Sequence, residues 1–207
     1  MNFEIDDYIA FTERALTPQR FKHSVGVMQV IAELAPIYGL NERTAMAAGI
    51  LHDIAKEFTP DDILKLANDN NVPLRTAYDR FPLFLHGPVG ACYAAQRFGI
   101  TDAMLLEAIS RHSYLGDGIA LSPSLCWCLR FADMLEPSRG WEDLKRQLRP
   151  SVYSANMGEG AYQLLNWIVP FHEAASLPVH PNISRLAREL SKLKAEKKLD
   201  EAGSLPV

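Results

Sequence analysis

Hydrophobic residues recur at intervals of three and four along most of the chain, and this spacing predicts helices. The clearest case lies between residues 18 and 38. Its apolar positions follow the helical period and form one stripe: Phe21, Val25, Met28, Ile31, Ala35 and Tyr38, widened by Val27, Val30 and Leu34. Thr17-Pro18 is typical of a helix start, and Gly39 offers the left-handed residue that often ends a helix. We therefore expect a long amphipathic helix here.

The same reasoning divides the rest of the chain into helices. They are expected over residues 6–16, 41–56, from 59 onward, 85–98, 102–112, 125–135, 141–148 and 160–175. Residues 68–84 are polar and interrupted by prolines, which predicts a loop with at most a short helix. Gly116-Asp117-Gly118 breaks the helical pattern, and Ser122-Pro123 is typical of a new helix start. No alternating strand pattern occurs, so the predicted fold class is all-α.

After residue 176 the pattern changes. Residues 177–181 are expected to form a linker, and Asn182 to cap a last helix whose lysine-rich sequence predicts a solvated or partly disordered tail. We therefore expect a single domain over residues 1–176, followed by a linker and a charged C-terminal helix or tail over residues 177–207.

One stretch stands out, between Thr44 and Lys56. Five residues share one helical face here, and four of them are small: Ala45, Ala48, Gly49, His52 and Ala55. Small side chains let another helix approach closely, which leaves the imidazole of His52 facing packed neighbours instead of water. Asp53 follows immediately. A neutral imidazole beside a buried carboxylate is costly unless something positive lies between them, and a divalent metal would supply that charge.

Composition narrows the class of protein. The chain has 207 residues, 48% of them hydrophobic, which is enough for one sizeable core. A net charge of −4 gives no general attraction for nucleic acid or anionic lipid, so neither partner is expected. No apolar run predicts a membrane span, and the acidic N-terminus is unlike a signal peptide. The three cysteines have no C-x-x-C spacing, which fits a reducing cytoplasm.

Histidines and aspartates occur on or beside the apolar faces of five predicted helices. The candidates are His23, His52, Asp53, His86, His112 and Asp133. Taken alone, each has an ordinary explanation: a core histidine can bond a backbone carbonyl, and Asp133 could pair with Arg130 or Arg139. Together they are unusual, because apolar faces normally carry uncharged residues. Mixed nitrogen and oxygen ligands suit divalent iron, manganese, cobalt, nickel or zinc.

The order of these residues resembles the HD-domain metal-dependent phosphohydrolase superfamily. The finer motifs are similar to one branch, the YqeK-type symmetrical bis(5'-nucleosyl)-tetraphosphatases. Those motifs are Arg20-x-x-His23-Ser24-x-Gly26-Val27, Ala48-Gly49-Ile50-Leu51-His52-Asp53-x-x-Lys56, Leu85-His86-Gly87-Pro88, Ala108-Ile109-x-x-His112 and Ala132-Asp133-x-x-Glu136-Pro137-x-Arg139. They span residues 20–139. The chain departs from the family pattern after His112, where Ser113 stands in place of the usual threonine.

The resemblance implies a helical bundle of the HD-domain type with a metal site. His23, His52, Asp53 and Asp133 would hold a divalent metal, and His86 and His112 would hold a second ion or contact phosphates. Iron is the expected metal, with manganese, cobalt, nickel or zinc as alternatives, and one or two ions. The implied substrate contacts are Arg20, Lys56, His86, His112, Ser113 and Arg139. Among catalytic residues, Asp53 would orient water, and His86 or His112 would protonate the leaving phosphate.

The function implied is metal-dependent hydrolysis of a phosphoanhydride in dinucleoside polyphosphates, with diadenosine tetraphosphate split into two ADP. One alternative is another HD-type nucleotide phosphohydrolase, either a deoxynucleoside monophosphate nucleotidase or a guanosine-polyphosphate hydrolase. A second is a non-catalytic, nucleotide-binding regulatory module. The sequence leaves open whether the chain forms a homodimer. Trp127, Tyr114 and Phe131 are nearby aromatic candidates for contacting the base, although core packing is the simpler expectation for each.

Overall fold

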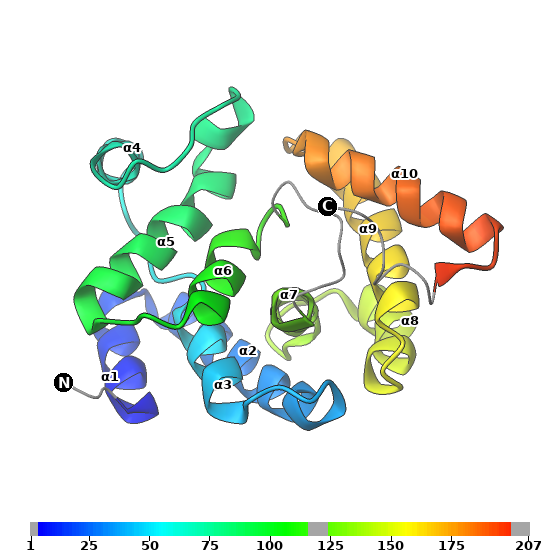
Figure 1. Ribbon diagram of the computed structural model, residues 1–207, viewed down its shortest axis with the longest axis horizontal. Coiled ribbons are helices and arrows are strands. Elements are labelled where there is room, and N and C mark those ends of the chain that lie inside the picture. The colour runs from blue at the N-terminus through cyan, green and yellow to red at the C-terminus, as the bar shows by residue number, and fades with distance from the viewer. Residues whose placement is uncertain (1–3, 116–123, 200–207) are drawn as a thin grey trace.

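The computed structural model describes residues 4–115 and 124–199, and every regular element in these ranges is helical (Figure 1). The elements are α1 Ile5–Ala15, α2 Pro18–Ile37, α3 Glu42–Leu51, α4 Pro60–Asp69, the short 3-10 helix η1 Tyr78–Arg80, α5 Pro82–Phe98, α6 Ala103–Arg111, α7 Ser124–Leu135, α8 Glu142–Tyr153, α9 Met157–Ala174 and α10 Pro181–Ala195. This confirms the predicted all-α class. In the part of the chain that the structure describes, we find no helix with the length and apolar character needed to cross a membrane.

Helix α7 lies in the middle of the bundle. In Figure 1 it is viewed almost end-on, with α4–α6 to its left, α8–α10 to its right and α2 running below it. It contacts α2, α3, α6, α8 and α9, and all its residues from Leu125 to Leu135 are buried. A helix that is apolar around its whole circumference belongs in the interior. Because Asp133 is part of α7, its carboxylate is carried into the core.

The most extensive helix pairing joins α2 and α3. A Cβ atom at Gly49 would lie 2.6 Å from the Cα atom of Met28 and 2.9 Å from its backbone nitrogen. The small-residue face predicted for this segment therefore allows the two backbones to touch. As a result, His52 at the end of α3 lies against His23 of α2, with 5.2 Å between the ring centroids.

Two helices end at a histidine. His52 follows α3 and His112 follows α6, each as the C-cap residue. The last carbonyl groups of a helix have no partner within it, and here the imidazoles bond to two of them, on Gly49 and Ile109. The prediction that the helix continues to Lys56 is therefore wrong, since residues 52–57 form turns.

Other boundaries also differ from the predictions. Helix α5 begins at Pro82, inside the segment expected to be a loop, and α8 continues past Pro150 to Tyr153. Helix α9 begins at Met157, because the side chain of Asn156 accepts the backbone N–H of Glu159 and caps it there. The predicted break at residues 116–118 and the predicted start at 122–123 lie outside the described residues.

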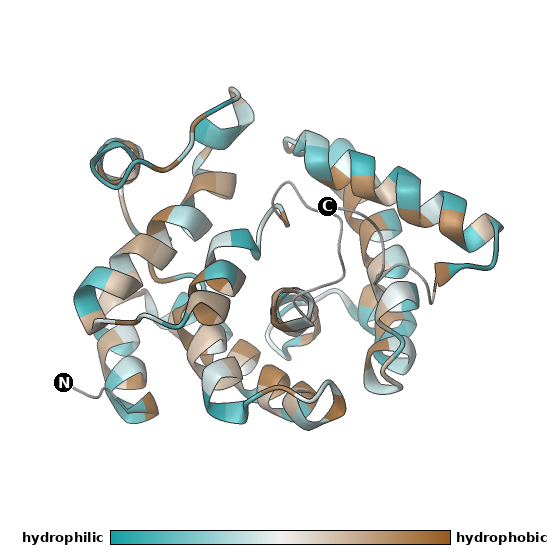
Figure 2. Cartoon of the chain, in the orientation of Figure 1, coloured by the Kyte–Doolittle hydropathy of each residue, from teal (hydrophilic) through white to brown (hydrophobic). Residues whose placement is uncertain are grey.

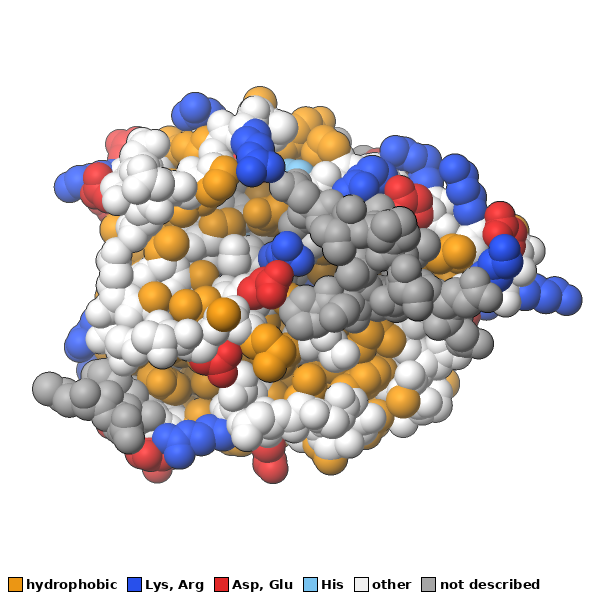
Figure 3. Space-filling view, in the orientation of Figure 1, with side chains coloured by type: hydrophobic (Ala, Val, Ile, Leu, Met, Phe, Trp, Pro, Cys, Tyr) orange, Lys and Arg blue, Asp and Glu red, His pale blue; other side chains and the backbone are white. Residues whose placement is uncertain are grey.

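Helix α10 packs against α9, so the expectation of a solvated tail is wrong. Ile183, Leu186 and Leu190 are buried along one side, and the apolar and polar residues alternate along the helix in Figure 2. Figure 3 shows basic side chains along its outer edge. The N-cap is His180 and not Asn182, because the Nδ1 atom of His180 accepts the backbone N–H of Asn182. The lysine-rich sequence therefore reflects only the outer face of this helix.

Candidate metal centre and its clefts

The predicted ligands come together where five helices meet. His52 and Asp53 directly follow α3, His112 follows α6, and the others lie within helices: His23 in α2, His86 in α5 and Asp133 in α7. All of these residues except His23 are buried, and the His23 side chain is only 12% exposed. The ring of His112 stands 5.0 Å from that of His52 and 4.8 Å from that of His86.

Three of the four imidazoles are held in the same way. The Nδ1 atoms of His52, His86 and His112 lie 2.8, 3.0 and 2.7 Å from the backbone carbonyl oxygens of Gly49, Pro82 and Ile109. A carbonyl can only accept a hydrogen bond, so each Nδ1 carries the proton. Burial lowers the pKa of His52 to about 3 and that of His86 to about 4, which keeps both rings neutral. The Nε2 atom of each of these two rings therefore presents a lone pair.

Those lone pairs converge on Asp53. The Oδ1 atom of Asp53 lies 3.1 Å from Nε2 of His86 and 3.4 Å from Nε2 of His112, and the two Nε2 atoms are 2.9 Å apart. Nε2 of His52 is buried without a hydrogen-bond partner, 3.7 Å from Oδ2 of the same carboxylate. Buried polar atoms normally have partners. An arrangement of facing acceptors is the one that a bound cation satisfies.

Two overlapping groups meet the distance requirements of a metal site. His23, His52 and Asp53 form one, and Asp53, His86 and His112 form the other, with the ligand atoms of each group within 4.8 Å of one another. Asp53 belongs to both. Imidazole and carboxylate ligands without thiolate suit the borderline and hard divalent metals. The residues present therefore fit a divalent cation.

Asp133 contacts the first group through His23. Its Oδ1 atom lies 3.1 Å from Nε2 of His23, and its carboxylate is also paired with Arg139 and, at 3.1 Å, with Arg130. Pairing with either arginine was one ordinary explanation of this residue, and both pairs occur. Burial alone raises the pKa of Asp133, but Arg139, His23 and Arg130 outweigh it and hold that pKa well below the usual range.

Asp53 is likewise ionised. Burial raises its pKa, but the Lys56 ammonium and the surrounding imidazoles outweigh burial, so the pKa lies well below its usual range. Nζ of Lys56 is 3.4 Å from Oδ1 of Asp53 and 3.0 Å from Nε2 of His86. The centre thus combines a buried negative charge with the partly exposed ammonium group of Lys56.

Two clefts open onto this centre. The larger, of about 630 Å³, is lined by Arg20, His23 and Glu57 among others, and the smaller, of about 150 Å³, by His86, His112 and Ser113. Asp53, Lys56, Arg139 and Trp141 line both. Every residue predicted to contact the substrate therefore lies in one or both clefts. Arg20 forms an ion pair with Glu57 at 3.0 Å near the mouth of the larger one.

Sequence reasoning missed two residues of the site. Glu136 belongs to one of the sequence motifs but has no predicted role there. In the structure its Oε1 atom lies 2.9 Å from Nδ1 of His23. Trp141 lines both clefts, and the Arg139 guanidinium lies 4.6 Å from its ring centre. The aromatic candidates chosen from the sequence lie elsewhere: Trp127 and Phe131 are buried in the core, as the simpler expectation had it. The available signal was the position of Trp141 two residues after Arg139.

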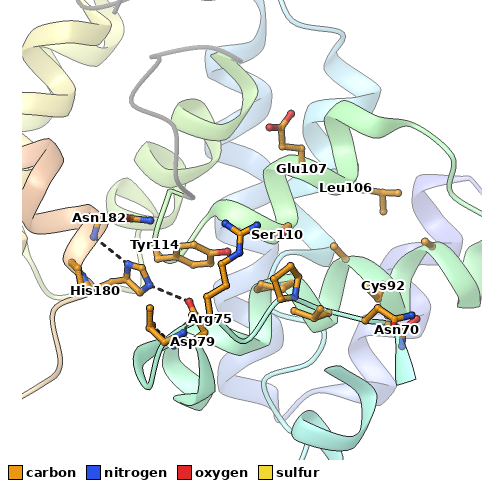
Figure 4. Close-up of a pocket in the computed structure, with 18 residues that line it drawn as sticks. Asn70, Arg75, Asp79, Cys92, Leu106, Glu107, Ser110, Tyr114, His180 and Asn182 are labelled. Atoms are coloured by element: carbon orange, nitrogen blue, oxygen red, sulfur yellow. Dashed lines mark hydrogen bonds and ion pairs between the residues drawn. The ribbon is translucent and has the colours of Figure 1, made fainter. Parts of the chain in front are cut away.

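A further cavity of about 550 Å³ lies apart from the centre (Figure 4). It is enclosed by the segment between α4 and η1, by α5 and α6, and by the start of α10. Tyr114 lines it together with His180, whose Nε2 atom is 3.3 Å from Oδ1 of Asp79. None of the predicted ligands or substrate contacts lines this cavity.

Comparison with known proteins agrees with this geometry. The family model of the HD domain matches residues 20–138. The chain is 30% identical to "Bis(5'-nucleosyl)-tetraphosphatase, symmetrical" of Bacillus subtilis over 86% of this chain and 92% of the relative. It is 29% identical to the protein of the same name from Halalkalibacterium halodurans, over 81% and 86%. A crystal structure of a predicted HD superfamily hydrolase involved in NAD metabolism from Clostridium acetobutylicum superposes with a TM-score of 0.82 and 25% identity, covering 93% of this chain and 99% of that one.

Proposed function

We infer the activity from one premise: this chain belongs to the HD domain family, and its matched relatives are named symmetrical bis(5'-nucleosyl)-tetraphosphatases. We propose that it is a phosphohydrolase that cleaves dinucleoside polyphosphates, with diadenosine tetraphosphate giving two ADP. The observation that carries this proposal is the convergence of imidazole Nε2 atoms on Asp53 next to two cationic side chains, Lys56 and Arg139.

The metal ligands follow from the two groups. We propose that His23, His52, Asp53 and Asp133 hold one divalent cation, and that Asp53, His86 and His112 hold a second. Iron is the proposed metal, with manganese and cobalt as the first alternatives to test. When bound, such a cation polarises a phosphoryl oxygen and makes water a stronger acid. The low pKa of His86 supports a ligand role over that of a proton donor, because its ring is neutral near pH 7.

The remaining polar residues of the site include positive charges that complement the negative charge of the substrate. A polyphosphate chain carries several negative charges, and Lys56 and Arg139 lie in both clefts, where they would neutralise them. Arg139 is held in place by Asp133 and by the ring of Trp141. Ser113 is buried in the smaller cleft, with its hydroxyl 3.5 Å from the carbonyl oxygen of Phe84, and is the proposed hydroxyl contact to a phosphate. Asp53 would hold and orient the attacking water.

Product analysis tests this proposal directly. The protein is incubated with diadenosine tetraphosphate and Fe²⁺, Mn²⁺ or Co²⁺, and the nucleotides are separated by chromatography. We expect ADP as the only product, and none when the metal is removed by a chelator. A mixture of AMP and ATP would indicate asymmetric cleavage, and no product would favour a regulatory nucleotide-binding protein. Deoxynucleoside monophosphates and guanosine polyphosphates are the comparison substrates for other HD-type activities.

Two further expectations remain predictions. A cytoplasmic location is supported by three free cysteine side chains within the described residues. Whether the protein acts as a monomer or a homodimer is a question for sedimentation analysis.

A further inference from the structure

We propose that Glu136 is a positioning residue for the metal centre, holding the His23 ring so that its Nε2 lone pair points at the cation. This inference rests on the proposed metal site. Glu136 directly follows α7 and is fully buried. Its Oε1 atom lies 2.9 Å from Nδ1 of His23, a residue 113 positions away in the chain.

His23 differs from the other imidazoles in the partner of its Nδ1 atom. The Nδ1 atoms of the other three rings face backbone carbonyls of their own helices. His23 lies in the first turns of α2, as His86 does in α5, yet its Nδ1 atom faces the side chain of Glu136 instead. A carboxylate in this position fixes the tautomer, orients the ring and makes Nε2 a stronger metal ligand.

The carboxylate of Glu136 is itself held firmly. Ser138 donates twice to it, with its backbone N–H to Oε2 and its hydroxyl to Oε1, both at 2.6 Å. A buried carboxylate without such partners would be strongly unfavourable. With them, it has few directions in which to rotate, so the position of the His23 ring is set by the turn that follows α7.

The sequence also leaves room for this carboxylate. Gly26, one turn along α2 from His23, faces Glu136: a Cβ atom there would lie 2.7 Å from Oε2 and 3.3 Å from the Glu136 Cβ. Any larger residue would displace the carboxylate. Gly26 therefore helps to place the Glu136 carboxylate, although a glycine has no side chain with which to contact a metal ligand.

The experiment measures metal binding and does not depend on turnover. Metal-free full-length protein is titrated with Mn²⁺ in competition with a chromophoric chelator, and the visible spectrum of the Co²⁺ form is recorded. The variants are Glu136→Gln, which keeps an oxygen facing His23 but removes the charge, Glu136→Ala, and Gly26→Ala. Gly90→Ala is the matched control, because its Cβ would meet neighbours only at ordinary distances of 3.6 Å or more. Thermal unfolding of each metal-free variant checks the fold.

We expect Glu136→Gln to weaken Mn²⁺ binding by about 10- to 100-fold and to change the Co²⁺ spectrum, as loss of an outer partner of a metal ligand does in other sites. Glu136→Ala should weaken it at least as much, Gly26→Ala should act in the same direction, and Gly90→Ala should bind like the wild type. Wild-type affinity in folded Glu136→Gln and Gly26→Ala would overturn the inference. A wild-type protein that binds no metal would instead overturn the proposed metal centre itself.

Discussion

Replacing Asp53 with asparagine is expected to lower the hydrolysis of diadenosine tetraphosphate by about 10³-fold or more, because one carboxylate serves both candidate metal groups. The neutral amide has the same shape but presents an N–H₂ group where one acceptor oxygen stood. It also leaves the neighbouring Lys56 ammonium without its ion-pair partner. The measurement is the initial rate of ADP release at saturating Mn²⁺, together with the metal content of the variant.

Asp61→Asn is the matched control for this substitution. Asp61 is exposed in the first turn of α4 and lines neither cleft described for the centre. We expect it to keep the wild-type rate. The fold of Asp53→Asn should remain helical by circular dichroism, because its neighbours in the core are unchanged. If Asp53→Asn retained more than a tenth of the wild-type rate, the assignment of this carboxylate would be wrong.

Replacing Gly49 with alanine is expected to lower the free energy of unfolding by about 2 kcal/mol or more. Alanine in a helix interior normally gains roughly 1 kcal/mol over glycine. At this position the added Cβ would lie 2.6 Å from a backbone atom of α2, which cannot turn aside as a side chain can. Separating α2 from α3 is therefore the only relief, and it disturbs the most extensive helix contact in the protein. Urea unfolding followed by circular dichroism measures the change.

The sign of the effect distinguishes strain from helix propensity. Gly90→Ala in α5 has space for the methyl group, so it should be neutral or gain up to roughly 1 kcal/mol. If Gly49→Ala were also neutral or stabilising, the close approach of α2 and α3 would not be real. We would also expect Gly49→Ala to weaken Mn²⁺ binding, because His52 and His23 are placed by this contact.

Much of the fold follows from local sequence signals. Thr59 accepts the backbone N–H of Asp62, and Asp102 that of Leu105, and each lies at the start of a predicted helix. Gly39 has the predicted left-handed backbone, with φ +62°. Caps and helical periodicity depend on residues within a few positions of one another, which is why they can be read from one sequence.

What could not be predicted depends on distant partners. Helix α3 ends at Leu51 because the ring of His52 bonds the carbonyl of Gly49, and this bond competes with continuation of the helix. The burial of α10 depends on the surface of α9, which its lysines do not reveal. Local sequence patterns predict neither the end of α3 nor the burial of α10, because the decisive contact is with another helix or with a backbone atom.

The candidate site divides in the same way. The histidines and aspartates could be found from their unusual place on apolar faces, and the structure brings them together. Their relation could not be foreseen: Asp53 lies at the centre, whereas Asp133 contacts the group beside His23. The partnership of His23 with Glu136, and the space that Gly26 provides, join two segments, α2 and the turn after α7, that no spacing rule connects.

The central claim is that buried imidazoles and carboxylates hold a divalent cation on which hydrolysis depends. The most direct measurement follows ADP release from diadenosine tetraphosphate by chelator-treated wild-type protein, with its metal content determined on the same sample, before and after Mn²⁺ is restored. We predict no ADP from the metal-free protein and recovery of activity as the ion is bound. ADP release at the full rate by protein with essentially no bound metal would contradict the account.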